Sequence, residues 1–382
     1  MSTVLYLPNG RNGLAAESAG PFLHRVLFVV GEVRDDGVGH AVLRLARELR
    51  RRGKEVSLAC GGGALAGEFE RIGIRPCVSR QLARPGRPLL LSRSLLAYIR
   101  DNDPELIHLF GRGLADWGMR LSAAAGRPYV LTVMTFSPTA RGGGLHGKWR
   151  RGSILVPSQE LREELVNRDH VPKDAIAVVR LGVALDDYER YREAEGSATA
   201  AVVGTVGPLT PERGVEYFVR AAREILGRGG DAHFLIAGDG PERAALRRLV
   251  RKLDLDDSVT MVQHFSDYRE MIAMLDVCVI PALQEALSLN VVEAMACRKP
   301  VVATGVGPVC GIITDGETGF LAPRKDPEAI ADRVLRLLGD RELARRIVDA
   351  AFELVRERFS MEASVRGLLA FYSRCLQRSE GS

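Results

Sequence analysis

The sequence lacks several features that would assign it to a well-marked class of protein. Its six cysteines form no C-x-x-C pair, and its cysteines and histidines do not have the spacing of a metal site. No run of about 18 apolar residues is present to span a bilayer, and the first 24 residues have no compact apolar segment behind a basic start. We therefore expect reduced thiols, no metal ion and a cytoplasmic protein, either free or at the inner face of the membrane.

An extreme of charge or composition is also missing. The 382 residues carry a net charge of +5, and 46% hydrophobic with 26% charged residues excludes disordered and fibrous classes. Residues 1–190 hold 28 basic and 20 acidic residues, a balance of +8, whereas the remainder holds 25 and 28, a balance of −3. The basic half favours an anionic surface or acceptor, although solvated arginine-rich helix faces explain the same balance. Because basic residues are not interleaved with aromatic ones, we expect no nucleic-acid partner.

Strands alternate with amphipathic helices along most of the chain. This order predicts an α/β protein with two Rossmann-like, doubly wound parallel sheets that face each other across a cleft. The predicted strands are 25–31, 55–60, 74–79, 105–110, 128–133, 153–156 and 176–179, then 200–206, 232–237, 258–262, 276–281, 300–303 and 318–321.

The same pattern predicts where the domains begin and end. The predicted parts are an N-terminal extension at 1–23, a first domain at 24–183, a polar linker at 184–198 and a second domain at 199–360. Residues 361–382 form a C-terminal helix and tail, for which a crossing back to the first domain is one arrangement.

Parallel sheets bind ligands beyond the carboxyl ends of their strands, so the loops there are the candidate sites. In the first domain, Gly37 and Gly39 belong to a glycine-rich loop that lets the backbone approach a phosphate or sugar, with a tight connection as the alternative. The loop is not the G-x-G-x-x-G fingerprint, which argues against a nicotinamide cofactor.

In the second domain, residues 207–214 occupy the same position. Arg213 is predicted to bind a diphosphate there, unless it is an arginine at the first turn of a surface helix.

The most informative segment is EALSLNVVEAMA, in which Glu285 and Glu293 lie eight positions apart. It follows an apolar run at 275–280 that is typical of a buried strand, and it opens a helix with apolar residues at helical spacing. This order aims backbone amides and the helix dipole at a phosphate. The glutamates can accept hydrogen bonds from hydroxyl groups on either side of that phosphate, which is the layout of a nucleotide sugar. The alternative is a capping carboxylate and an exposed residue.

These residues resemble the family-four retaining glycosyltransferases, which have the two-domain fold called GT-B. The resemblance covers roughly residues 25–375 and is strongest at 200–325, where the paired glutamates, the EAMA helix, the PVVAT strand and the DGETGFL turn occur in family order. It implies that Glu285 binds the hydroxyls of the donor sugar and that Glu293 binds the ribose. Backbone amides near Ser288 and Leu289 are implied to hold the distal phosphate.

The resemblance also implies the chemistry. Gly207 and Arg213 belong to the donor site, Glu285 and Arg213 are the catalytic residues, and the reaction uses a UDP-sugar or GDP-sugar without a metal or other cofactor. We therefore predict a retaining glycosyltransferase that moves a sugar to an acceptor hydroxyl in glycan, polysaccharide or glycolipid synthesis. The acceptor is predicted to be a glycan or lipid-linked molecule. From its residues, the basic first domain, in particular its glycine-rich loop at 141–151, offers a place for a lipid-linked acceptor or for peripheral membrane contact, with an ordinary solvated loop as the alternative.

Three positions depart from the family pattern. Pro208 stands where the family has an arginine, Met134 where many members have a histidine, and Gly311 where a glutamate is common. These departures motivate an alternative, a catalytically weak or inactive homologue that binds a nucleotide sugar or a partner glycosyltransferase. A nucleotide-sugar epimerase ranks last, because the cleft lacks the acid and base residues expected of one.

Overall fold

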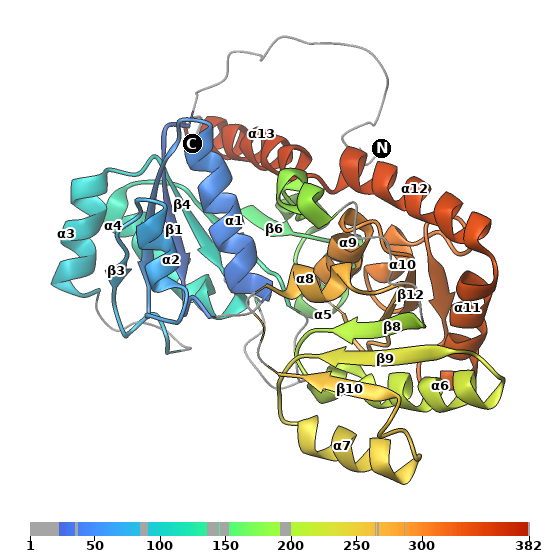
Figure 1. The fold of residues 1–382 in the computed structure, drawn as a ribbon. Coiled ribbons are helices and arrows are strands. Elements are labelled where there is room, and N and C mark those ends of the chain that lie inside the picture. The colour runs from blue at the N-terminus through green and yellow to red at the C-terminus, as the bar shows by residue number, and fades with distance from the viewer. Residues whose placement is uncertain are drawn as a thin grey trace.

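The computed structural model describes residues 23–34, 37–84, 91–135, 145, 153–191, 200–263, 265, 267–285 and 287–380. These residues form two parallel sheets, each with helices packed on its faces (Figure 1). The predicted fold class is confirmed.

The first sheet has the strand order β3-β2-β1-β4-β5-β6-β7, and its pairs are parallel. Its strands are β1 (Arg25–Val30), β2 (Glu55–Cys60), β3 (Cys77–Val78), β4 (Leu106–Phe110), β5 (Tyr129–Thr132), β6 (Ser153–Val156) and β7 (Ile176–Val178). The helices are α1 (Gly37–Arg51), α2 (Ala66–Arg71), α3 (Arg93–Asn102), η1 (Arg112–Leu114), α4 (Ala115–Ala125), α5 (Gln159–Asp169) and η2 (Lys173–Ala175).

Apolar strand runs explain this sheet, because strands covered on both faces are apolar almost throughout. All five residues of β4 are buried, and the sheet separates two hydrophobic clusters. The predicted strand at 74–79 shrinks to the two residues of β3, since Pro76 has no N–H to donate to a neighbouring strand.

The second sheet has the order β10-β9-β8-β11-β12-β13, again with parallel pairs. Its strands are β8 (Ala201–Val206), β9 (Ala232–Ala237), β10 (Val259–Val262), β11 (Val277–Ile280), β12 (Val301–Thr304) and β13 (Phe320–Ala322). The helices are η4 (Pro211–Arg213), α6 (Val215–Gly227), α7 (Arg243–Lys252), α8 (Tyr268–Ala273), α9 (Leu289–Ala296), α10 (Val309–Ile312), α11 (Pro327–Gly339) and α12 (Arg341–Arg358). β8 and β11 lie at its centre, so the loops after them meet at one edge.

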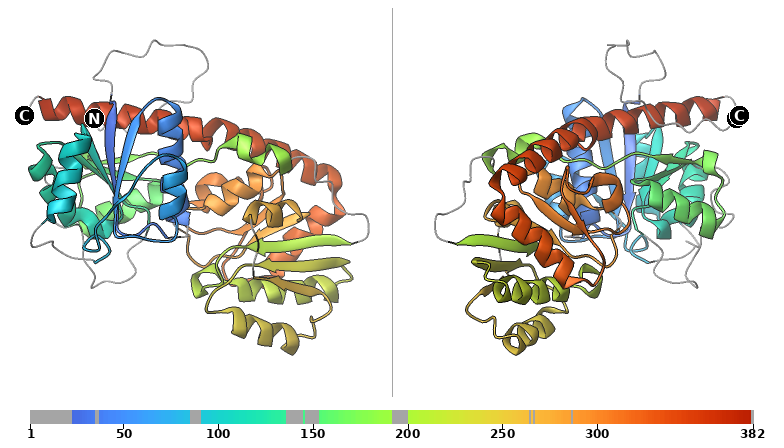
Figure 2. Two further views of the ribbon diagram at one scale, coloured as in Figure 1. Left: turned by 60° about the vertical axis from the view of Figure 1, so that its left-hand side comes forward. Right: turned by 90° about the vertical axis from the view of Figure 1, so that its right-hand side faces the viewer.

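The last helix, α13 (Met361–Glu380), packs on the first domain, as Figure 2 shows. Where the chain crosses between the domains, the amide of Val183 donates to the carbonyl of Phe359 at 2.9 Å, and the amide of Met361 donates to the carbonyl of Val183 at 2.8 Å. Further along α13, the hydroxyl of Tyr372 lies 2.5 Å from Nδ1 of the buried His108 in β4. Burial lowers the pKa of His108 to about 3, so this imidazole is neutral.

The segment predicted as a linker is ordered in its described part. A 3-10 helix, η3 (Leu185–Tyr191), brings Tyr188 and Tyr191 into a buried cluster of the second domain. Residues 192–199 lie outside the described part of the chain, as do residues 1–22 of the predicted extension.

Candidate functional site

Two loops of the second domain are joined by their backbones. The amide of Leu283, after β11, donates a hydrogen bond to the carbonyl of Glu212, after β8, at 2.8 Å. Gly214 packs so closely that a Cβ on it would lie 2.3 Å from the carbonyl oxygen of Pro281, and its φ of +60° also favours glycine. Arg213 is therefore held beside the segment that carries Glu285.

Glu285 is 9% exposed and makes contacts with both of its oxygens. Its Oε2 accepts from Nη1 of Arg213 at 2.5 Å. Its Oε1 accepts from the backbone amide of Ser288 at 3.2 Å. The sequence predicts that this amide holds a phosphate, but in the structure it binds the glutamate, as the capping alternative requires. Arg213, Glu285 and Ser288 nevertheless form one charged cluster at the start of α9.

Ser288 has an unusual environment. Its φ of +51° is left-handed, a conformation that costs a residue other than glycine of the order of 1 kcal/mol. Its side chain is fully buried, and its Oγ has no hydrogen-bond partner among the described residues. A buried hydroxyl without a partner is costly, and a ligand oxygen is one way to satisfy it. Leu289, the first residue of α9, is also buried.

Glu293 lies one turn further along α9 and is 6% exposed, so it is not the exposed residue of the alternative interpretation. Its Oε1 accepts from Nη1 of Arg44 at 2.8 Å and from the hydroxyl of Tyr268 at 2.8 Å. Tyr188 completes the group, with its hydroxyl 3.4 Å from that of Tyr268. Arg44 comes from α1 of the first domain, whereas the other three residues belong to the second. The group therefore lies between the domains.

Electrostatics fix the charge states of this group. Burial, the largest single cause, lowers the pKa of Arg44, but the charge of Glu293, its hydrogen bond to Arg44 and the nearby Tyr268 and Tyr188 together outweigh burial, so the pKa lies above its ordinary value. Burial and then the same carboxylate raise the pKa of Tyr268. Arg44 is thus a guanidinium with a neutral phenol beside it.

The hollow beside Arg213 is small in this structure. It lies between the carboxyl ends of β8 and β11 and is lined by Gly207, Pro208, Arg213 and Asn290 among others. Its volume is about 10 Å³. Ligand pockets for molecules of drug size commonly have about 300 to 1,000 Å³. This hollow by itself is therefore too small for a nucleotide sugar.

The two glycines predicted in the first-domain loop differ. A Cβ on Gly39 would lie 2.0 Å from the carbonyl oxygen of Arg34, so Gly39 is required for the loop to pack on α1. A Cβ on Gly37 would meet no atom within 4 Å. The structure thus gives Gly39 a packing role, as the tight-connection alternative predicts.

A family model described as Glycosyl transferases group 1 matches residues 187–354, and one described as Glycosyltransferase Family 4 matches residues 36–187. The chain belongs to the family-four glycosyltransferases, whose two domains these models describe. Alpha-D-kanosaminyltransferase of Streptomyces kanamyceticus is 31% identical over 256 residues, which span 64% of this family member and 66% of that enzyme. N-acetyl-alpha-D-glucosaminyl L-malate synthase of Bacillus anthracis is 34% identical over 151 residues, which span 40% and 38%. The match thus covers less than two thirds of either relative's length.

Other comparisons extend over nearly the whole chain. The 2-deoxystreptamine N-acetyl-D-glucosaminyltransferase of Streptomyces fradiae is 28% identical over a match that covers 94% of this chain and 97% of that enzyme. Among solved structures, Anabaena HepE in complex with UDP superposes with a TM-score of 0.78 at 19% identity, over 91% of this chain and 100% of that one. A glycosyltransferase from Rickettsia africae gives a TM-score of 0.76 at 17% identity, over 92% and 99%. These structures show the GT-B fold.

The three departures from the family pattern have different surroundings. Pro208 is exposed at the small hollow, beside Arg213. Met134 is buried in the hydrophobic core of the first domain. Gly311 is exposed in α10, and a Cβ on it would lie 3.7 Å from Oε1 of Glu160 in the first domain. Of the three departures, one therefore lies at the small hollow, one lies beside the other domain, and one is a core residue.

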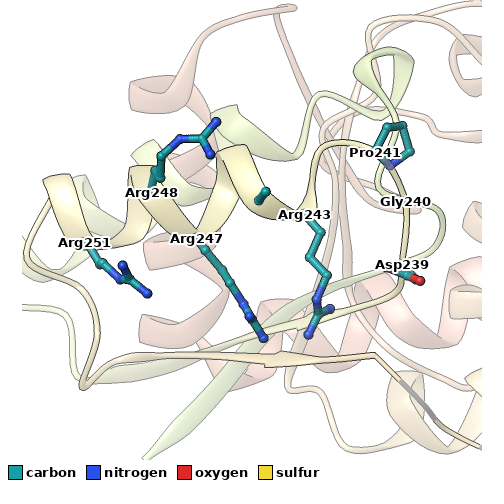
Figure 3. A pocket seen from close by; sticks show the side chains of 8 residues that line it. Asp239, Gly240, Pro241, Arg243, Arg247, Arg248 and Arg251 are labelled. Atoms are coloured by element: carbon teal, nitrogen blue, oxygen red, sulfur yellow. The ribbon is translucent and has the colours of Figure 1, made fainter.

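A second hollow, of about 370 Å³, runs along α7 of this family member (Figure 3). Arg243, Arg247, Arg248 and Arg251 line it, with the turn after β9 at one end. None of the residues predicted to bind the donor lines this hollow. The α7 surface is a local basic exception in the acidic half of the chain.

The described residues contain no group of three or more His, Cys, Asp or Glu side chains placed to hold a metal ion. No helix in the same part of the chain is both long and apolar enough to cross a membrane. The loop at 141–151 lies outside the described residues except for Leu145, which is buried.

Sequence reasoning missed Arg44, Tyr268 and Tyr188. Arg44 lies on a helix whose apolar spacing is clear, but the residue is one of many arginines and its partner is 249 positions away. The only available signal was the position of α1, which follows the glycine-rich loop and so begins at the cleft.

Proposed function

We propose that this chain is a retaining glycosyltransferase that moves a sugar from a UDP-sugar or GDP-sugar to an acceptor hydroxyl. The observation that supports it most is the cluster of Arg213, Glu285 and Ser288 at the start of α9, one turn from Glu293 at the domain interface. One cation, two carboxylates and a helix start lie together where two Rossmann-like domains meet. That arrangement has groups for a diphosphate and for hydroxyls on both sides of it.

Each residue has a defined task in this proposal. Arg213 neutralises the charge that grows on the departing nucleoside diphosphate, and Ser288 and the amides near Leu289 bind the distal phosphate. Glu285 binds hydroxyls of the transferred sugar, and Glu293 binds the ribose. Since Arg213 and Glu285 contact each other at 2.5 Å, the donor must exchange with that ion pair. Positioning and leaving-group stabilisation then supply most of the rate.

The acceptor side of the proposal rests on the first domain. We propose a glycan or lipid-linked acceptor in glycan, polysaccharide or glycolipid synthesis, at the cytoplasmic side of the membrane. One relative is named as acting on 2-deoxystreptamine, so small aminocyclitols of this kind should also be assayed as acceptors.

We propose peripheral contact with an anionic membrane, which is tested by sedimentation with neutral and phosphatidylglycerol-containing vesicles. Equal binding to both would contradict an electrostatic contact.

A turnover assay tests the activity. UDP-sugars and GDP-sugars are incubated with lipid, glycan and aminocyclitol acceptors, and release of nucleoside diphosphate is measured together with the anomeric configuration of the product. We expect transfer with retention for at least one pair, and loss of transfer in Arg213→Ala. Product of inverted configuration would refute the retaining mechanism.

Pro208 favours a second candidate, a homologue that binds a nucleotide sugar or a partner glycosyltransferase without turnover. Its exposed ring stands where the family has an arginine, so Arg213 lacks that neighbouring cation. Nucleotide binding that is lost in Glu293→Ala, with no turnover for any donor and acceptor, would support this candidate over the enzyme.

A further inference from the structure

Arg44 is a first-domain residue in direct contact with a carboxylate of the second domain. Its Nη1 lies 2.8 Å from Oε1 of Glu293, and the two side chains are 14% and 8% exposed. A buried carboxylate without a partner would be strongly unfavourable, so this guanidinium stabilises Glu293 while no other ligand is bound.

The hydrogen bonds already made by Glu293 limit what else it can bind. One carboxylate oxygen has two lone pairs, and Oε1 already accepts from both Arg44 and Tyr268. A ribose diol that uses both oxygens of the carboxylate needs one of those positions. Tyr268 belongs to the same domain as Glu293 and moves with it, whereas Arg44 leaves when the domains separate.

We propose that Arg44 and the ribose diol of the donor exchange on Glu293. This inference rests on the proposed function, because it takes Glu293 as the ribose ligand. Arg44 thereby holds the domains together in the empty protein and sets the affinity for the ribose. It is a positioning residue that acts through Glu293.

Two nucleotides separate this effect from general electrostatics. Removing the charge of Arg44 weakens the binding of any diphosphate, with or without the diol. We therefore compare UDP with 2′,3′-dideoxyuridine diphosphate, and GDP with its dideoxy analogue, by isothermal titration calorimetry. The diol ratio, defined as the Kd of the dideoxy nucleotide divided by the Kd of the parent, reports only the contribution of the hydroxyls.

We expect Arg44→Gln to raise the diol ratio by about tenfold, the equivalent of one hydrogen bond to a charged group. Arg47→Gln is the matched control, since Arg47 lies on the same helix three residues later and is exposed. It should leave the ratio at the wild-type value. A ratio in Arg44→Gln that is unchanged or lower would overturn the exchange.

Glu293→Gln distinguishes failure of this inference from failure of the proposed function. If wild type binds neither UDP nor GDP, or if Glu293→Gln keeps the full diol ratio, the donor-site assignment is wrong and the exchange falls with it. If Glu293→Gln lowers the ratio while Arg44→Gln does not raise it, the exchange alone is wrong.

Should Arg44→Gln fail to fold, Arg44→Lys is the second variant. Lysine retains the charge without the planar guanidinium, so it should raise the diol ratio by a smaller factor. No rise in that variant would count against the exchange in the same way.

Discussion

The ion pair between Arg44 and Glu293 predicts a large coupling between two residues of different domains. The perturbation is a double-mutant cycle with Arg44→Ala, Glu293→Ala and the double variant. Removal of one partner leaves the other charge buried, which typically costs about 3 to 5 kcal/mol. The double variant removes both charges. From the 2.8 Å contact and side-chain exposures of 14% and 8%, we expect a coupling free energy of about 2 to 3 kcal/mol, at the upper end of the range for residues in contact.

Urea unfolding followed by tryptophan fluorescence and by far-ultraviolet circular dichroism measures the four free energies of unfolding. The control cycle uses Glu48 in α1 and Arg52, the residue directly after that helix, whose pair is 2.9 Å apart with side-chain exposures of 14% and 32%. An i, i+4 pair of this kind contributes about 0.3 to 0.5 kcal/mol. A coupling between Arg44 and Glu293 no larger than that of the control would refute the reasoning, because the pair would then not be formed and buried.

Gly39→Ala should lower the free energy of unfolding by at least about 1 kcal/mol, because its Cβ would meet the Arg34 carbonyl at 2.0 Å; Gly37→Ala is the control, and equal effects would contradict the packing role. Arg213→Ala should lower kcat about 10²- to 10³-fold with the cognate donor, and an unchanged kcat would remove Arg213 from the leaving-group site. The pKa of His108 is lowered to about 3, so below pH 6.5 the unfolded chain binds a proton that the folded chain excludes. Its contribution to stability is therefore lost as pH falls from about 6.5 towards 3, by up to about 1.4 kcal/mol per pH unit. His108→Asn should show a shallower loss over that range in urea titrations, and identical slopes would mean that His108 is protonated in the folded protein.

The sheets were predictable because each central strand is an apolar run between turn residues. The runs at 106–110 and 277–280 are buried throughout, and their parallel pairing follows from the helices between them. The strand at 74–79 was overestimated, since hydrophobicity alone does not weigh the missing N–H of Pro76. Local pattern therefore gives the positions of elements better than their ends.

The candidate site was predictable only within the second domain. Spacing places Glu285 and Arg213 in adjacent loops, and the structure brings them together at 2.5 Å. Spacing does not show that Glu285 accepts the amide of Ser288, because capping depends on loop torsions such as the left-handed φ of that serine. It also does not reveal Arg44, because a contact across the domain interface leaves no periodic signal in either segment.

The most direct test of the donor site is a crystal structure of the protein soaked with UDP or GDP. We expect a diphosphate within hydrogen-bonding distance of Arg213 and Ser288 at the start of α9, with the ribose hydroxyls on Glu293. Nucleotide density along the arginines of α7, with Glu293 still bound by Arg44, would contradict it.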